Sequence, residues 1–232
     1  MRHLALILLP AFCLSFFSCN FGKGKSPDRN AVREHNFPSV KIGNQRWMSQ
    51  NLNVSHYRNG DPIPEIKDPA LWGEAGGGKC CTYRNDSSLD SAYGKLYNWY
   101  AVSDSRQLCP LGWHIPSDSE WSSLSQALGG ANCSGAEIKE AGFSHWSAPN
   151  TGGSGNSGFR ALPSGGREPD GSFVSRGYYA YFWNNNQNDS SSNCSFDEGC
   201  ARECTLSYKG SFLLQSSTSK KRGMSVRCLQ DH

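Results

Sequence analysis

The chain has few aliphatic residues and little excess charge. Hydrophobic residues make up only 37% of its 232 residues, while aromatic residues make up 12%. A composition poor in aliphatics but rich in aromatics and glycine is typical of short strands and loops packed on flat rings, and it argues against a helical bundle. The net charge of +3 is too small and too dispersed to indicate a nucleic-acid-binding protein.

The chain also lacks a hydrophobic run long enough to cross a bilayer. The apolar run from Leu4 to Phe17 has about 14 residues, which is typical of a signal peptide. It leads into Ser18-Cys19, which is similar to a bacterial lipoprotein cleavage site. We predict a signal peptide over residues 1–18 and a lipid on Cys19, so that the protein is anchored to a membrane of the bacterial cell envelope, the outer membrane being favoured. An ordinary signal peptide cut nearby and a short uncleaved anchor are the alternatives.

Residues 19–38 are polar and show no apolar period, so we predict a tether there and one domain over residues 39–230. No two histidines in the chain have the spacing of metal ligands. No Ser/His/Asp or paired-carboxylate arrangement stands out either. These absences favour a protein that is not an enzyme.

Cysteine is plentiful, in contrast. An even number of cysteines in an exported chain indicates disulfides. Eight cysteines permit 105 pairings, so their connectivity stays open. Apart from Cys13 and Cys19, the cysteines are Cys80, Cys81, Cys109, Cys133, Cys194, Cys200, Cys204 and Cys228.

Periodicity predicts an α+β domain. VKI and QRWM flank Gly43-Asn44 and predict a hairpin. The spacing of apolar residues predicts a first helix over residues 93–102. Ser117-Asp118-Ser119-Glu120 is a capping box that predicts a second helix, which Gly129-Gly130 would end. The rest of the chain is predicted to form antiparallel strands, with a polar surface loop over residues 184–193.

Six motifs occur in one order: VKIGNQRWMSQNLNV, YGKLYNWYAV, CPLGWHIPSDSEWSSL, GFRALPSGGR with GSF, YFWNNN and SVRCL. Together they closely resemble the Fibrobacter succinogenes major paralogous domain family, whose pattern is similar to the C-type lectin-like fold and its formylglycine-generating-enzyme branch. The resemblance implies two helices flanking small antiparallel sheets, with long loops and disulfide staples. It also implies a Cys109–Cys228 disulfide.

The resemblance suggests two sets of ligand-binding residues. Glu168, Asp170, Asn184 and Asn185 lie in segments similar to those with which sugar-binding C-type lectins hold Ca²⁺, and carboxylate and amide oxygens suit that ion. A plain turn and a plain loop are the simpler interpretation. Tyr179, Tyr181 and Trp183 could stack on sugar rings, or they could face the core. No other cofactor is predicted.

The favoured hypothesis is therefore a non-enzymatic envelope lipoprotein. Its lectin-like domain would bind a glycan, a surface polymer or another envelope protein. One alternative is a copper-dependent oxidase of the formylglycine-generating branch, with thiolates at Cys200 and Cys204, because soft thiolates suit Cu(I). Another is a structural subunit of a surface appendage.

Overall fold

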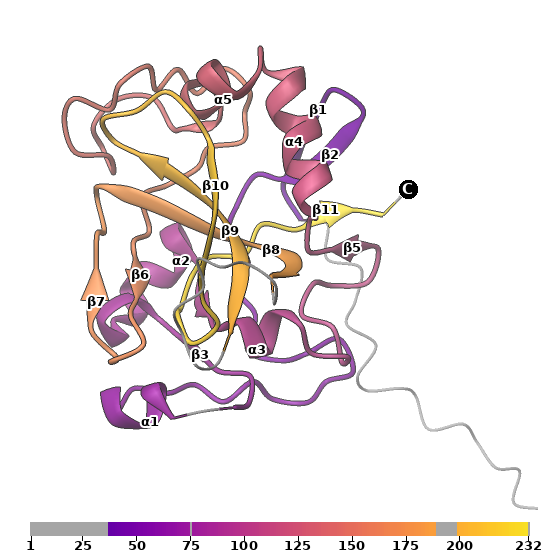
Figure 1. Cartoon of the computed structure of the whole chain (residues 1–232), viewed down its shortest axis with the longest axis vertical. Helices are drawn as coiled ribbons and strands as arrows, with labels where there is room; N and C mark the ends of the chain where they lie inside the picture. The colour runs from indigo at the N-terminus through magenta and orange to yellow at the C-terminus, as the bar shows by residue number, and fades with distance from the viewer. Residues whose placement is uncertain (1–36, 75, 189–198, 232) are drawn as a thin grey trace, which may run out of the picture.

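The structure of the protein is a computed structural model that describes residues 37–74, 76–188 and 199–231. Within these ranges short helices and small antiparallel sheets are joined by long coil segments, as predicted (Figure 1). The α-helices are α1 (Pro69–Gly73), α2 (Asp90–Tyr93), α3 (Trp99–Val102), α4 (Asp118–Ala127) and α5 (Ala131–Ile138). The strands are β1 (Ser39–Ile42), β2 (Gln45–Met48), β3 (Cys80–Cys81), β4 (Leu96–Tyr97), β5 (Trp113–His114), β6 (Gly166–Arg167), β7 (Phe173–Val174), β8 (Tyr179–Asn188), β9 (Cys200–Ser207), β10 (Leu214–Ser219) and β11 (Leu229–Gln230).

One sheet joins the beginning, the middle and the end of the domain. β1 and β2 form the predicted hairpin, and Gly43 takes a φ of +58° in its turn, a conformation that favours glycine. β11 pairs with β2 and with β5, so the strand order is β1-β2-β11-β5. The predicted last strand, Ser225–Leu229, is regular only at its end, where β11 covers Leu229 and Gln230.

A second sheet, β10-β9-β8, runs through the centre of the molecule (Figure 1). β8 is longer than predicted. After a bulge that follows Trp183, it continues to Asn188 and pairs again with β9. Residues 184–188 of the loop predicted over residues 184–193 are therefore part of a strand, in which Gln187 and Asn188 pair with Ala201 and Cys200 of β9. Residues 189–193 lie outside the described residues. Two pairs of short strands, β3-β4 and β6-β7, complete the sheets of the described residues.

The helices agree with the sequence in part. α4 begins at the predicted capping box, in which Ser117 and Glu120 bond reciprocally to each other's backbone N–H groups. The helix predicted over residues 93–102 is wrong as a single element, because Gly94 has a φ of +69° and Leu96–Tyr97 pairs with β3 as a strand. The described residues also contain helices that the prediction of two did not include, α5 among them.

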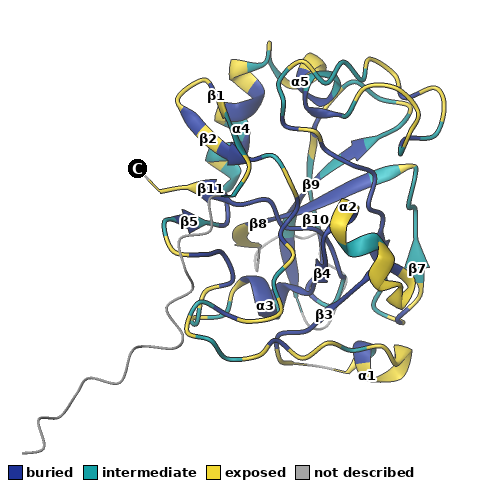
Figure 2. Ribbon diagram, turned by 180° about the vertical axis from the view of Figure 1, so that it is seen from behind, coloured by how far each residue is buried: buried dark blue, intermediate teal, exposed yellow. Residues whose placement is uncertain are grey.

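Aromatic rings fill the core. Trp47, Trp121 and Phe159 pack with ring centroids between 4.7 and 5.9 Å apart. Trp183 packs on Trp99, and its Nε1–H donates to the carbonyl of Tyr97 at 2.7 Å. Burial continues from the strands into the coil segments that cover them (Figure 2). The low aliphatic content is thus compensated by large flat side chains.

Buried cations hold the coil segments together. Lys139 donates to the carbonyls of Thr151, Ser207 and Gly210. Arg167, Lys79 and Arg227 likewise donate to backbone carbonyls, from positions that are almost fully buried. Coil segments leave carbonyls without partners in regular structure, and a buried carbonyl needs a donor. These side chains supply the missing donors.

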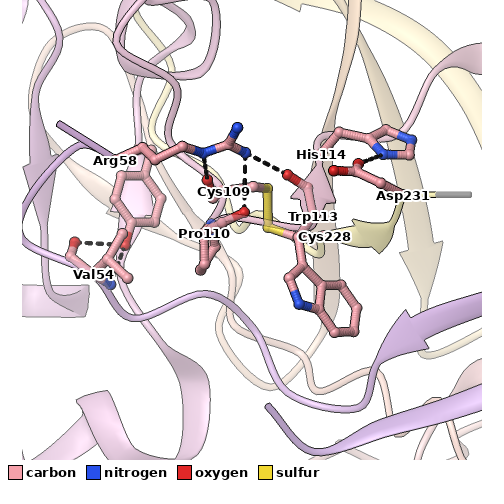
Figure 3. Close-up of a disulfide and its surroundings, with 9 residues drawn as sticks. Val54, Arg58, Cys109, Pro110, Trp113, His114, Cys228 and Asp231 are labelled. Carbon is pink, nitrogen blue, oxygen red and sulfur yellow. Dashed lines mark hydrogen bonds and ion pairs between the residues drawn. A yellow bond between two sulfur atoms is a disulfide. The ribbon is translucent and has the colours of Figure 1, made fainter. Parts of the chain in front are cut away.

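Cys109 and Cys228 form the disulfide that the resemblance implied, with Cα atoms 6.1 Å apart and a sequence separation of 119. It links the segment before β5 to the residue before β11, which are already neighbours in the four-stranded sheet (Figure 3). The disulfide therefore reinforces a contact that the strands also make.

Candidate functional site

The cysteines differ from the prediction. Cys80, Cys81, Cys133 and Cys204 are free thiols, so the expectation that all eight cysteines form disulfides is wrong. Cys80 and Cys81 are buried on β3 and do not reach two different partners. Burial raises the pKa of both thiols to about 12, so they remain protonated and unreactive. They are small core residues here. Cys19 and Cys194 lie outside the described residues.

The predicted thiolate pair for copper is not available in this structure. Cys200 is disulfide-bonded, and the Cys204 thiol is fully buried, with a pKa raised well above its usual value by that burial. Both residues lie on β9. A disulfide sulfur and a buried protonated thiol do not provide two thiolates for a soft metal.

The predicted Ca²⁺ ligands do not come together. Glu168 forms an ion pair with Arg222 at 2.9 Å. Asp170 accepts from the backbone N–H and the hydroxyl of Ser172, within the turn between β6 and β7. The Asn184 amide donates to Asp118 instead, at the start of α4. No group of three or more His, Cys, Asp or Glu side chains suited to a metal occurs among the described residues.

The aromatic residues that were candidates for stacking on sugar rings are buried or half-buried. Trp183 is fully buried, and Tyr181 is only 9% exposed beneath Arg222, whose guanidinium carbon lies 4.4 Å from the ring centroid. Tyr179 is half-buried and stacks on Tyr181 with a centroid distance of 5.7 Å. The second of the two interpretations, that these rings belong to the core, holds for Trp183 and Tyr181.

Asn185, one of the predicted ligand-binding residues, lines a hollow on the surface. Its side chain is exposed, while its backbone N–H donates to the carbonyl of Pro116. It lines a groove of about 250 Å³ beside the disulfide, which we call the disulfide groove. The groove is lined by Arg58, Val102, Ser103, Asp104, Gln107, Leu108, Cys109, Trp113, His114, Ile115, Asn185 and Asp231.

The disulfide groove has an apolar floor and a polar rim. Val102, Leu108 and Trp113 are buried, whereas Ser103 and Gln107 are exposed. Polar and charged residues line the groove beside these apolar ones, and its volume lies below the usual range of small-molecule sites. It is open to solvent, so it suits one small group of a larger ligand.

Arg58 is held rigidly at the groove. Its Nε donates to the carbonyl of Cys109 at 3.1 Å, and its Nη2 donates to the carbonyls of Pro110 and Trp113 at 3.0 and 2.7 Å. Its Nη1 bonds to no described residue and lies on the side of the guanidinium away from these carbonyls (Figure 3). The side chain therefore has fixed geometry and free donors.

His114 ties together two walls of the groove. Its Nδ1 lies 2.7 Å from Asp231 Oδ1 (Figure 3). Its Nε2 lies 2.9 Å from Glu120 Oε1. Burial opposes the charge on the imidazole, but the two carboxylates outweigh it and raise the pKa of His114. With both nitrogens bonded to carboxylates, His114 has a positioning role and no free nitrogen with which to accept a proton.

The opposite rim has a strained backbone. Gln107 takes a φ of +61°, which is uncommon for a residue other than glycine. Its N–H donates to the carbonyl of Asp104, and its carbonyl accepts from the N–H of Arg58, both at 2.9 Å. Hydrogen bonds from Arg106 lower the pKa of Asp104 to about 2. Strained residues held by their surroundings cluster at functional sites.

None of the residues Arg58, Asp104, Gln107, His114 and Asp231 is among the site residues predicted from the sequence. They come from three distant parts of the chain and do not together form a local motif. The proximity of Cys109 and Cys228, implied by the resemblance, is the only signal that could have pointed to this region.

No described helix is long and apolar enough to cross a membrane.

Comparison with known proteins gives a family and no close relative. Comparison with curated proteins finds no match. Comparison with solved structures finds no match either. The Fibrobacter succinogenes major domain matches the chain over residues 40–230, which is most of its length and nearly all of the predicted domain. The chain therefore belongs to the Fibrobacter succinogenes major domain family.

Proposed function

We propose that this protein is a non-enzymatic recognition module of the cell envelope, and that it binds a glycan in the disulfide groove. The observation that carries the proposal is the groove itself, where a rigid Arg58 and exposed amides stand over an apolar floor. Amide and hydroxyl groups such as those of Gln107, Asn185 and Ser103 match the alternating donors and acceptors of sugar hydroxyls. A surface polymer or an envelope protein is the other class of ligand that such a module could bind.

The fold and the anchor belong to the same proposal. A disulfide between the middle and the end of the domain, a capped helix and small antiparallel sheets support a lectin-like fold. A lipid on Cys19 would place the domain at a membrane, outer membrane included, with residues 20–38 as the tether. We propose that binding needs no Ca²⁺, because Glu168 and Asn184 are already bonded to Arg222 and Asp118.

A glycan array tests this proposal. The purified full chain is applied with Ca²⁺ and with a chelator, beside a Gln107→Ala/Asn185→Ala variant that alters only exposed side chains. We expect binding that is unchanged by the chelator and at least about tenfold weaker in the variant. Asn156→Ala, an exposed change away from the groove, is the matched control. The proposal would be contradicted if the Gln107→Ala/Asn185→Ala variant bound glycans as strongly as the Asn156→Ala control, or if the protein bound no glycan on the array.

A further inference from the structure

We propose that the disulfide groove selects a hexuronic acid unit, a sugar ring that carries a carboxylate, and that Arg58 Nη1 is the group that binds this carboxylate. The inference rests on the proposed function, because it names the class of glycan that would occupy the same groove. Its starting point is a charge that the protein leaves without a counter-charge.

Two carboxylates line the groove, and each is already paired. Asp231 lies 2.7 Å from His114, and Asp104 accepts from Arg106, also at 2.7 Å. Arg58 bonds only to neutral carbonyls and forms no ion pair with a described carboxylate. It is therefore the charged group of the groove that a ligand can neutralise. An anion placed at Nη1 would form a charge-assisted hydrogen bond, about twice as strong as a neutral one.

Further carboxylates outside the groove oppose a simple attraction of anions. Glu120 also contacts His114, and Asp61 also contacts Arg106, so each of these ion-pair clusters carries one excess negative charge. Counted together with Arg58, the groove and these clusters carry a small net negative charge, so their field does not attract anions. A bare anion gains little from it, and selection must come from direct contact with Nη1 combined with contacts elsewhere in the groove.

The remaining contacts favour a sugar ring. The buried side chains of Trp113, Val102 and Leu108 line the groove, and so do the exposed amides of Gln107 and Asn185, which can bond to sugar hydroxyls. Because three carbonyls fix the guanidinium, little side-chain entropy is lost when Nη1 bonds to a ligand. The groove therefore combines a preorganised cation with neutral polar groups, as a ring bearing one carboxylate requires.

Calorimetric titration of the full chain with an oligogalacturonate, and with its fully methyl-esterified form, tests the inference. The two ligands differ only in the charge of their carboxyl groups. We expect the acid to bind at least about tenfold more tightly than the ester. Equal affinities would overturn the inference and leave the proposed function standing. Binding of neither these ligands nor any arrayed glycan would overturn both.

Variants that change the charge of the rim but not its shape provide a second test of the inference. Gln107→Glu and Asn185→Asp each add a negative charge at the rim through an exposed side chain. Each should weaken binding of the acid about threefold to tenfold more than it weakens binding of the ester, because only the acid meets the added charge. Asn156→Asp is the matched control and should change neither affinity. Equal losses for acid and ester in the rim variants would contradict a role for charge.

Arg58→Lys tests the cation itself. It keeps the charge but loses the planar fork, so the preference for the acid should fall to about threefold or less. Arg58 also supports the turn before β5, so the melting temperature of this variant must be measured beside its affinity. An unchanged preference in a folded Arg58→Lys protein would exclude Nη1 as the binding group. Tighter binding of a short peptide with a free carboxyl end than of the acidic sugar would likewise overturn the inference.

Discussion

At the scale of single residues, this protein uses cations where other folds use regular structure. Arg227 is 1% exposed, and it donates to the carbonyls of Met48 and Phe159 and to Asn51 Oδ1. Burial lowers the pKa of Arg227 to about 9, which reflects the cost of holding this charge away from water. The hydrogen bonds of Arg227 offset that cost, because they give buried carbonyls of the coil segments the donors that they would otherwise lack.

Arg227→Gln should lower the free energy of unfolding by about 3–5 kcal/mol, because it leaves buried acceptors without donors. Urea denaturation measures the change. Arg46→Gln is the matched control, since Arg46 is exposed on β2, and we expect an effect within about 0.5 kcal/mol there. Comparable effects of the two substitutions would show that the buried hydrogen bonds do not stabilise the fold.

Free cysteines should differ sharply in reactivity. Cys133 is exposed on α5, whereas Cys80, Cys81 and Cys204 are buried. We expect alkylation of the native protein at Cys133 and at none of these three, and alkylation of all four after unfolding without reductant. Peptide mapping by mass spectrometry measures both states. A disulfide found at Cys80 or Cys81 would show that the arrangement of thiols described above is wrong.

At the scale of elements, the same pattern of residues is compatible with more than one type of secondary structure. Leu96 and Tyr97 have the spacing of a helix face, yet they form β4 because Cys80–Cys81 lies alongside and Met224 bridges to Tyr97. α5 contains Gly135, a poor helix former, at a point where a Cβ would lie 2.3 Å from the carbonyl oxygen of Phe212. The close packing of α5 against Phe212 therefore requires a glycine at this position, and the helix propensity of the local sequence does not indicate this.

His114 couples three elements and should make stability depend on pH. The pKa of His114 is raised in the folded protein, so its contacts stabilise fully below its unfolded value of about 6.5. That stabilisation is lost as the pH rises through the folded pKa. We expect His114→Gln to destabilise the protein more at pH 5.5 than at pH 9, measured by urea denaturation at both values. A pH-independent difference would mean that the ion pairs with Glu120 and Asp231 contribute nothing.

At the scale of the whole molecule, the Cys109–Cys228 disulfide closes most of the domain. It spans 119 residues, and its ends also meet through β5 and β11. One strand pair and one covalent bond hold the same junction, and Cys109 also lines the groove, so the disulfide reinforces one wall of the groove. The disulfide is thus connected both to stability and to the proposed binding site.

Cys109→Ala/Cys228→Ala should lower the free energy of unfolding by about 4–5 kcal/mol, since the unfolded chain regains the entropy of a long loop. Cys133→Ser, which removes an exposed free thiol, is the control and should have little effect. Denaturant midpoints of the three proteins are compared without reductant. If the double variant were as stable as the control, the strand pairing alone would maintain the junction.

The sequence alone determined the family, the α+β class, the β1–β2 hairpin and the start of α4, and the family resemblance implied the Cys109–Cys228 pairing. Each of these depends on a local pattern, or on six motifs in order. Only the tertiary structure decided that Trp183 is core, that Asn185 stands at a groove and that Arg58, Gln107 and Asp231 meet there. Burial and proximity arise from contacts between distant segments. No local spacing of residues encodes them, because the coil segments that carry this site have no periodicity from which to infer their faces.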